Sequence, residues 1–235
     1  MPSDADEIDY MKRKPYRELV GSLLYLSNTT RPDIYFAVGM LSRFMENPGT
    51  KHWHAAGHVL RYLRYTSTMG ITYKSNMPLQ ITTYSDADFA GDPDTRKSTS
   101  GYVLQFLGGA ISWRSKKQTI TAQSTVEAET IALSFAVREI LWIKKLLKDL
   151  NLSASFAQTI CVDNRGCIAI CKEGSITDKT KHIGIKLGLA KDNIQSGNVT
   201  LQYTPNAEIA ADILTKQLPR ARQDSNLQQL GMKNN

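Results

Sequence analysis

The first third of the chain places apolar residues at helical spacing between short breaks. Pro15 stands where a helix would begin, since proline is favoured at the first position of a helix. The apolar periodicity predicts helices over residues 16–26, 33–45 and 51–65. The sequence Asn-Pro-Gly at residues 47–49 predicts the break between the second helix and the third.

From residue 79 onward the pattern changes to short β-branched runs that alternate with helical segments. The predicted strands cover residues 79–85, 102–107, 110–113, 159–162 and 199–203. The predicted helices cover residues 124–150, 165–172, 181–194 and 207–216. Gly108 and Gly109 indicate a hairpin between two of the strands. This order of elements predicts an α/β domain with a mixed sheet, after a domain boundary near residues 74–78.

In the long predicted helix over residues 124–150, two glutamates point to different sides of the helix. Apolar residues follow Glu129 at the spacing of one helix face, at Ala132, Leu133, Ala136, Ile140, Ile143 and Leu147. Glu129 is therefore expected to point toward the sheet. Glu127 lies on the other side of the helix, three residues after Ser124, which is the spacing of a capping box. We interpret Glu129 as functional and Glu127 as structural.

Three aspartates extend this set of candidate acids. Asp86 and Asp163 each stand at the end of a predicted strand, where ligand sites gather in open α/β sheets. The alternative is that each of them only caps the turn that follows. Asp212 comes three residues after Ile209 in the last predicted helix, so it can lie beside the buried face. A solvated helix acid is the alternative for Asp212.

Four carboxylates that converge in a cleft of low dielectric constant repel one another, so such a cluster persists when cations neutralise it. Oxygen-only ligands suit Mg²⁺ or Mn²⁺ rather than zinc. Two such ions about 3.5–4 Å apart can activate water and stabilise the leaving oxygen of a phosphodiester. The acids therefore predict a metal-dependent hydrolytic site.

Composition limits the remaining possibilities. The chain has 235 residues and a net charge of +7, which favours a polyanionic partner, either nucleic acid or an acidic membrane surface. The apolar segments are too short and too interrupted for a membrane span, and the acidic start of the chain does not resemble a secretory signal. Three cysteines without metal-binding spacing, Cys161, Cys167 and Cys171, are expected to be buried free thiols in a reducing compartment.

The chain resembles a known family in a series of motifs that occur in order. They are Tyr84–Gly91, Lys97–Tyr102, Ser112–Trp113, Lys116–Gln118, Glu127–Glu129, Val162–Asn164, Lys181–Ile183 and Ala211–Lys216. Together they resemble the ribonuclease H domain that closes the Ty1/copia retrotransposon Pol polyprotein, over residues 80–218. The segments Pro15–Leu26, Thr30–Ile34 and His52–Leu63 resemble the end of its reverse transcriptase. The adjacent Asp-Asp pair of polymerases is absent, because Ala87 separates Asp86 from Asp88, so no polymerase activity is predicted.

The resemblance implies an α/β ribonuclease H-like fold with a five-stranded mixed sheet, preceded by a small helical segment. Residues 1–75 would be a helical remnant of the reverse transcriptase, residues 76–218 the ribonuclease H-like domain, and residues 219–235 a C-terminal tail. The family cleaves the RNA strand of RNA–DNA hybrids with two Mg²⁺ ions, for which Mn²⁺ can substitute. By motif, the four metal-binding and catalytic acids would be Asp86, Glu129, Asp163 and Asp212.

The resemblance also implies partners. RNA–DNA hybrid would be held by contacts to 2′-hydroxyls and phosphates. The residues that could contribute are Ser124, Asn164, Lys179, Lys181 and His182. The rest of the reverse transcriptase polyprotein would be a second partner, no membrane partner is expected, and the location would be intracellular, in a cytoplasmic virus-like particle or the nucleus. Gly184 and Gly188 depart from the family, which usually has an acidic residue and a histidine there, and two glycines weaken the predicted helix.

Two other functions remain open from the sequence. One is a nucleic-acid-binding remnant of a retrotransposon polyprotein without catalysis. The other is a DNA-cutting or integrase-like nuclease, although integrases take their third acid from a later helix than the one that carries Glu129. A zinc site at His54 and His58 is disfavoured because no third ligand is evident, and a basic helix face near nucleic acid is favoured instead.

Overall fold

The structure is a computed structural model that describes residues 4–151, 158–173 and 181–234. The chain divides into two compact units, which are described separately. Unit 1 contains residues 1–71 together with 232–235, and unit 2 runs from Thr72 to Gly231.

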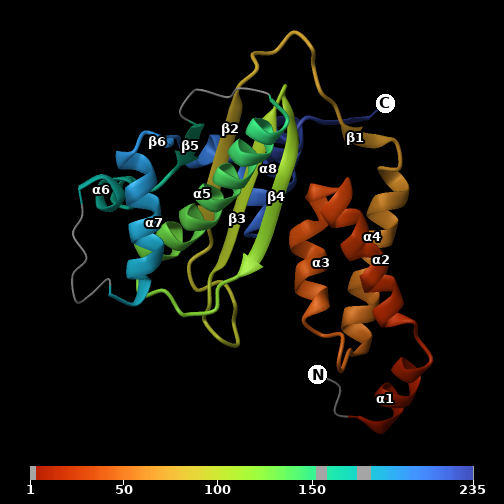
Figure 1. Ribbon diagram of the computed structural model, residues 1–235. Coiled ribbons are helices and arrows are strands. Elements are labelled where there is room, and N and C mark those ends of the chain that lie inside the picture. The colour runs from red at the N-terminus through yellow and green to blue at the C-terminus, as the bar shows by residue number, and fades with distance from the viewer. Residues whose placement is uncertain (1–3, 152–157, 174–180, 235) are drawn as a thin grey trace. The chain divides into compact units, whose positions relative to one another are not determined.

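Unit 1 is built from helices packed around a small apolar core (Figure 1). Its elements are α1 (Ala5–Lys12), α2 (Tyr16–Thr29), the 3-10 helix η1 (Pro32–Ile34), α3 (Tyr35–Ser42), α4 (Thr50–Tyr65) and the paired strands β1 (Met69–Ile71) and β7 (Met232–Asn234). The core contains Tyr16, Val20, Leu23, Val38 and Val59. The three helices predicted from the apolar periodicity are present, although η1 occupies the start of the second one. The sequence prediction did not include α1 or the β1–β7 pair.

Unit 2 contains a five-stranded sheet in the order β4-β3-β2-β5-β6, within the residues that the structure describes. The strands are β2 (Ile81–Ala87), β3 (Thr99–Phe106), β4 (Gly109–Lys117), β5 (Gln158–Val162) and β6 (Val199–Tyr203). The first three strands are antiparallel neighbours, and β5 and β6 are added in parallel, so the sheet is mixed as predicted. Leu107 and Gly108 turn between β3 and β4 with positive φ angles of 52° and 79°, which confirms the hairpin.

Helical segments connect these strands. They are α5 (Thr125–Asp149), α6 (Arg165–Glu173), η2 (Lys181–Ile183), α7 (Gly184–Gln195), η3 (Asn206–Glu208), η4 (Ala210–Leu214) and α8 (Arg220–Gln229). The predicted α-helix over residues 207–216 is wrong, because two 3-10 helices with an extended residue, Ile209, between them occupy this segment. The segment predicted as a C-terminal tail contains α8 and β7. The domain boundaries assigned from the resemblance stay a prediction.

The two faces of the sheet carry different elements. Tyr102 and Leu104 share a core cluster with Leu133 of α5, whereas Gly101 lies under η4. Because neighbouring residues of a strand point to opposite faces, α5 and η4 cover opposite sides of the sheet. Figure 1 draws α5 in front of the strands and α8 behind them.

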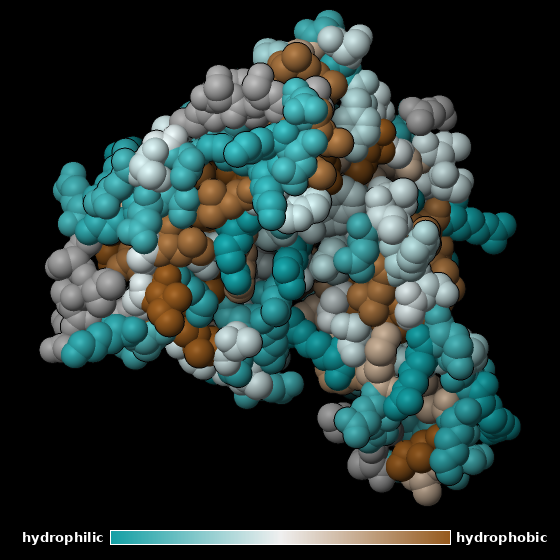
Figure 2. All heavy atoms as spheres, in the orientation of Figure 1, coloured by the Kyte–Doolittle hydropathy of each residue, from teal (hydrophilic) through white to brown (hydrophobic). Residues whose placement is uncertain are grey.

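The surface of unit 2 is mostly hydrophilic where α6 and α7 lie, and Figure 2 shows hydrophobic atoms there in small separate patches. All three cysteines are buried free thiols, as expected from the sequence. Within the described residues, no helix combines the length and the apolar character that a bilayer crossing requires.

Candidate active site

Asp86 enters the site from the end of β2. Its side chain is buried, the hydroxyl of Thr215 donates a hydrogen bond to Oδ2, and Gly101 is its partner across the sheet. Burial raises the pKa of Asp86 to about 7, Lys216 opposes this rise, and the negative charge of Asp212 adds to it. A carboxyl held in this way is costly to ionise unless a cation approaches it.

Glu129 enters the site from the sheet-facing side of α5, as the helix periodicity predicted. The backbone N–H of Ala87 donates to its Oε1 at 3.3 Å. Its Oε2 is buried and accepts no hydrogen bond from the part of the chain that the structure describes. Burial first, and then the charges of Asp86 and Asp163, raise the pKa of Glu129 well above its usual range.

Glu127 has a structural role at the start of α5, where one of the two hydrogen bonds of the predicted capping box is formed and the second goes to the residue before Ser124 instead. Its backbone N–H donates to Ser124 Oγ at 3.2 Å, and its Oε2 accepts from the backbone N–H of Gln123 at 2.7 Å. The same Oε2 lies 3.0 Å from His182 Nε2. The carboxylate of Glu127 is therefore occupied at the start of α5, while that of Glu129 faces the site.

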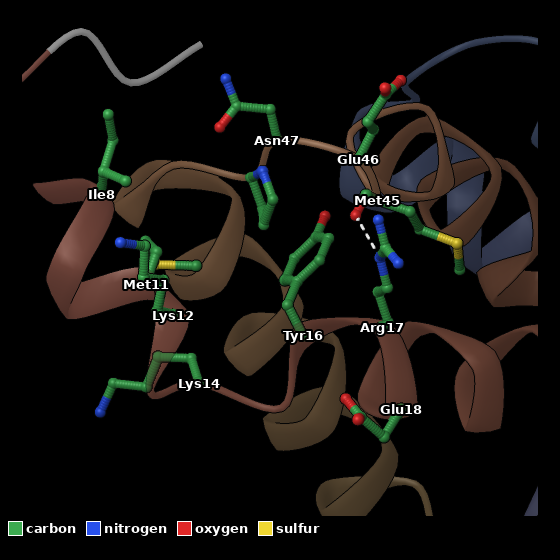
Figure 3. Close-up of a pocket in the computed structure, with 11 residues that line it drawn as sticks. Ile8, Met11, Lys12, Lys14, Tyr16, Arg17, Glu18, Met45, Glu46 and Asn47 are labelled. Carbon is green, nitrogen blue, oxygen red and sulfur yellow. Dashed lines mark hydrogen bonds between the residues drawn. The ribbon is translucent and has the colours of Figure 1, made fainter.

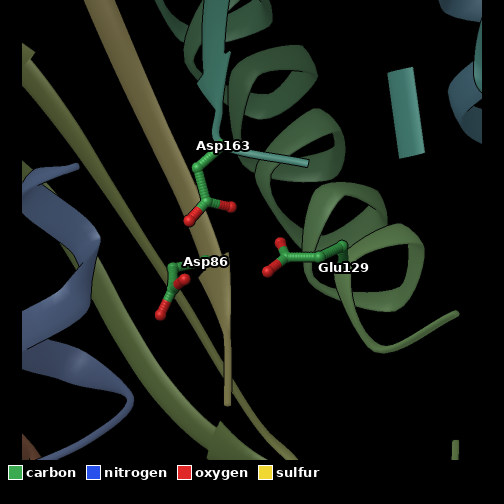
Figure 4. Close-up of side chains that lie close together, drawn as sticks. All are labelled: Asp86, Glu129 and Asp163. Carbon is green, nitrogen blue, oxygen red and sulfur yellow. The ribbon is translucent and has the colours of Figure 1, made fainter. Parts of the chain in front are cut away.

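Asp163 follows β5 and completes a group of three acids. One carboxylate oxygen from each of Asp86, Glu129 and Asp163 lies within 4.8 Å of the other two. Figure 4 shows the three side chains converging from β2, α5 and the end of β5. Burial raises the pKa of Asp163 as well, and Asp212 adds to that rise.

Asp212 is buried beside these acids but bonded differently. Its Oδ1 lies 2.9 Å from Lys216 Nζ, and its Oδ2 accepts from Arg222 at 2.9 Å. Lys216 Nζ also lies 3.6 Å from Asp86 Oδ2, so it joins Asp212 to the group of three. The structure thus brings all four predicted acids to one end of the sheet, but cations occupy both oxygens of the fourth.

The residues present fit a divalent cation. Three acids supply oxygen ligands within one small volume, and the buried Glu129 Oε2 lacks the hydrogen bond that a buried polar atom normally has. Hard oxygen ligands of this kind suit Mg²⁺ or Mn²⁺. Asp86, Glu129 and Asp163 could therefore hold a metal ion.

The five residues predicted to bind nucleic acid have local roles where the structure describes them. Ser124 caps α5, and Asn164 Oδ1 accepts from the backbone N–H of Cys167 at 2.9 Å. His182 contacts Glu127, and Lys181 is exposed at the start of η2. Lys179 lies outside the described residues. Their contribution to nucleic-acid binding stays a prediction.

Asp88, the neighbour of Asp86, is turned toward β3 and accepts a hydrogen bond from the backbone N–H of Thr99. Three residues that contact the acids of the site were not among the predicted site residues, namely Thr215, Lys216 and Arg222. Lys216 could have been found, because it follows Asp212 by four residues. Arg222 could not, because it belongs to α8, which was not predicted.

A separate pocket lies in unit 1 (Figure 3). Its charged lining residues are of both signs, namely Lys12, Lys14, Arg17, Glu18 and Glu46. Arg17 Nε donates to the carbonyl of Met45 at 2.8 Å, and Lys14 Nζ lies 4.5 Å from the centre of the Tyr10 ring. This pocket has no group of converging acids within the described residues, so it is not the candidate active site.

Curated proteins similar to this chain are transposon polyproteins. The Retrovirus-related Pol polyprotein from transposon TNT 1-94 of Nicotiana tabacum is 39% identical over 234 residues, which are 100% of this chain and 18% of that protein. The chain belongs to the copia-type retrotransposon Pol family. The polyprotein from transposon RE2 of Arabidopsis thaliana is 39% identical over 205 residues, 87% of this chain and 14% of that protein. This member of the copia-type family thus spans less than a fifth of these two relatives.

A shorter curated relative is the Secreted RxLR effector protein 161 of Plasmopara viticola. It is 47% identical over 133 residues, 57% of this chain and 94% of that protein. No protein-family model matches the chain.

Solved structures similar to this copia-type chain include a ribonuclease H1 isolated from compost, with 18% identity, a TM-score of 0.45, and coverage of 59% of this chain and 94% of that one. The prototype foamy virus protease–reverse transcriptase has 11% identity and a TM-score of 0.38, with coverage of 92% of this chain and 26% of that one. Unit 2 is an α/β domain, and its five-stranded mixed sheet is the one that the sequence resemblance implied.

Proposed function

We propose that unit 2 hydrolyses the RNA strand of RNA–DNA hybrids with two divalent ions, Mg²⁺ in the first place, during retrotransposon reverse transcription. The observation that carries this proposal is the convergence of Asp86, Glu129 and Asp163, with one buried carboxylate oxygen of Glu129 left without a hydrogen bond within the described residues. Membership in the copia-type Pol family supports it.

The acids would hold the ions from different elements of unit 2. Asp86, on the central strand, would hold the ions from the sheet, while Glu129 and Asp163 would hold them from α5 and from the end of β5. When bound, the ions would activate the attacking water and stabilise the charge on the leaving oxygen. The products would carry a 3′-hydroxyl and a 5′-phosphate. Asp212 supplies the fourth negative charge and binds Lys216 and Arg222.

The proposed partners follow from this chemistry. The RNA–DNA hybrid supplies the scissile phosphodiester, and the net charge of +7 favours its polyanionic backbone. The chain aligns with only part of its polyprotein relatives, so the rest of a reverse transcriptase polyprotein is the second proposed partner.

The test is cleavage of a hybrid with a labelled RNA strand by the full chain, with Mg²⁺ or Mn²⁺ added. Asp163→Asn should lower the rate roughly a thousandfold, since a metal site contributes several kcal/mol and about 1.4 kcal/mol is tenfold. Asp192→Asn is the matched control, because Asp192 is an exposed acid on α7, and it should cleave like the wild type.

Other outcomes would point to other functions. Binding of hybrid without cleavage in either metal would overturn the enzyme proposal and favour a nucleic-acid-binding remnant. Cleavage of duplex DNA at a rate comparable to the hybrid would favour a DNA nuclease instead.

A further inference from the structure

Lys216 places a positive charge between two acids of the site. Its Nζ lies 2.9 Å from Asp212 Oδ1 and 3.6 Å from Asp86 Oδ2. The side chain of Lys216 is 33% exposed, so it is only partly accessible to solvent. The proposed hydrolysis gives this lysine no task.

Asp212 fixes the position of this ammonium group. While Oδ1 faces Lys216, Oδ2 is held by Arg222, which also donates to the backbone carbonyls of Asn206 and Ala207. Arg222 is thereby bonded to η3 and to Asp212 of η4 at the same time. The carboxylate of Asp212 is held from two sides, which leaves Lys216 directed at Asp86.

The contacts of Asp86 and Asp212 therefore differ in kind. Asp212 is paired with two cations at 2.9 Å, whereas Asp86 shares one of them at the longer distance of 3.6 Å. Asp86 is also one of the three acids whose oxygens converge. A divalent ion that uses Asp86 comes close to the ammonium group and is repelled by it.

We propose that Lys216 is a resident counter-ion of the acidic site, which stabilises the metal-free protein and competes with the divalent ion for Asp86. This inference rests on the metal site of the proposed function. It makes Lys216 a positioning residue that sets metal affinity, not a catalytic residue.

A counter-ion and a merely structural residue predict opposite results when the ammonium group is removed. Loss of a structural contact would weaken both the fold and the metal site. Loss of a counter-ion lowers the stability of the metal-free protein, because the acids then repel one another without compensation, but it tightens divalent binding. The direction of the change in metal affinity therefore decides between them.

The experiment measures Mn²⁺ binding to the full chain by titration calorimetry, and thermal unfolding without metal. Lys216→Met should bind Mn²⁺ about tenfold tighter than the wild type and unfold at a lower temperature in its absence. Lys216→Arg keeps the charge and should stay within about threefold of the wild-type affinity. If Lys216→Met is unfolded at the assay temperature, Lys216→Gln replaces it, with the same expected tightening.

Lys144→Met is the matched control. Lys144 Nζ donates to Asn198 Oδ1 at 3.0 Å, and the residue lies fifteen positions after Glu129, about 22 Å along α5. Its replacement removes the same charge and one contact, so Mn²⁺ affinity should not change.

Two results would overturn the inference, and they are distinguishable. If the wild type binds Mn²⁺ and Lys216→Met binds it equally or more weakly, the counter-ion role fails while the metal site stands. If the wild type neither binds Mn²⁺ nor cleaves hybrid, the proposed function fails and the counter-ion role fails with it.

Discussion

Each unit buries a group of charges, and the two groups differ in balance. In unit 1, Arg31 donates from Nε and a terminal nitrogen to the two oxygens of Asp33, at 3.0 and 2.8 Å. Tyr62 donates to Asp33 as well, and Thr66 accepts from Arg31. In unit 2, four acids share two cations, so negative charge is in excess.

The difference shows how burial alone fails to identify a functional site. The Arg31–Asp33 pair is compensated in charge and in hydrogen bonds, which is the arrangement of a structural ion pair. Among the described residues, the three converging acids of unit 2 have only one contact with a cation, the longer 3.6 Å contact from Lys216 to Asp86, and Glu129 Oε2 lacks a hydrogen bond. Uncompensated charge at a buried position costs stability, and a bound cation would supply the compensation.

The largest expected effect comes from breaking the compensated pair. Arg31→Met should destabilise unit 1 by about 3–5 kcal/mol, because it leaves the Asp33 carboxylate buried without its cation. Asp86→Asn should leave the metal-free stability of unit 2 unchanged or higher, because it removes one of several mutually repelling charges. Amide hydrogen exchange followed separately in α2 and β2 measures the two effects.

Arg61→Met is the control for unit 1, since Arg61 is an exposed residue of α4, and it should change stability by less than about 0.5 kcal/mol. Equal destabilisation of unit 1 by Arg61→Met and Arg31→Met would contradict the structural role of the buried pair.

The second prediction concerns a substitution under η4, Gly101→Ala, that changes no charge. A Cβ on Gly101 would lie 2.6 Å from Thr215 Cγ2 and 3.2 Å from the carbonyl oxygen of Ala211. Gly101→Ala should therefore displace η4 from the sheet, and hybrid cleavage should fall up to about 100-fold, the cost of roughly a 1 Å misplacement. The measurement is the cleavage rate at saturating Mg²⁺.

Gly188→Ala in α7 is its control. A Cβ there would meet no described atom within 4 Å, so the replacement should stabilise the helix by about 1 kcal/mol and leave cleavage unchanged. Full activity in Gly101→Ala would show that the approach of η4 to the sheet does not matter to the site.

Much of the fold could be predicted because its pattern is local. The apolar face of α5 indicates the direction of Glu129, and the capping box distinguishes Glu127 from it by spacing alone. The segment over residues 207–216 was predicted wrongly, because Arg222 satisfies the carbonyls of Asn206 and Ala207 from α8. Arg222 lies 15 and 16 residues after Ala207 and Asn206, and helical periodicity cannot indicate contacts at such a separation.

In the site, too, local patterns could be predicted and contacts between distant segments could not. The convergence of Asp86, Glu129 and Asp163 follows from strand ends and one helix face, so sequence patterns indicated it. Of the two cations bound to Asp212, Lys216 follows it by four residues, but Arg222 could not be predicted, because α8 reaches Asp212 only through packing. The predicted catalytic role of all four acids still depends on the cleavage experiment.

The third prediction removes a cation from Asp212, as Arg31→Met removes one from Asp33. Arg222→Ala should destabilise unit 2 by roughly 2 kcal/mol, because the buried Asp212 loses a charged hydrogen-bond donor. Arg220→Ala should have almost no effect, since Arg220 is 96% exposed and its distance to Asp224 is 4.0 Å. Urea unfolding of each variant, together with amide hydrogen exchange in β2, measures the difference in stability.

A double-mutant cycle shows whether Arg222 acts through Asp212. In the Asp212→Asn background, Arg222→Ala should cost clearly less than it does in the wild type. Equal costs in both backgrounds would mean that Arg222 stabilises η3 alone, and that Asp212 is not held in the way that the compensated Asp33 is.

The last prediction concerns pH and the acids of unit 2. The folded pKa of Asp86, about 7, lies above its ordinary value of 3.8, so the folded protein binds a proton more tightly than the unfolded chain. The stability that this group contributes is fully present below about pH 4 and is lost as pH rises through 7. Glu129 and Asp163 shift in the same direction.

Metal binding should depend on pH in the opposite sense, because a divalent ion needs the deprotonated acids. With a pKa of about 7 for Asp86, proton competition should weaken Mn²⁺ binding about tenfold between pH 8 and pH 6. Calorimetric titrations at the two pH values, and thermal unfolding with and without Mn²⁺, measure both trends. Metal-free unit 2 that gains stability between about pH 4 and pH 7 would contradict the uncompensated burial of these acids and remove the contrast with the Arg31–Asp33 pair.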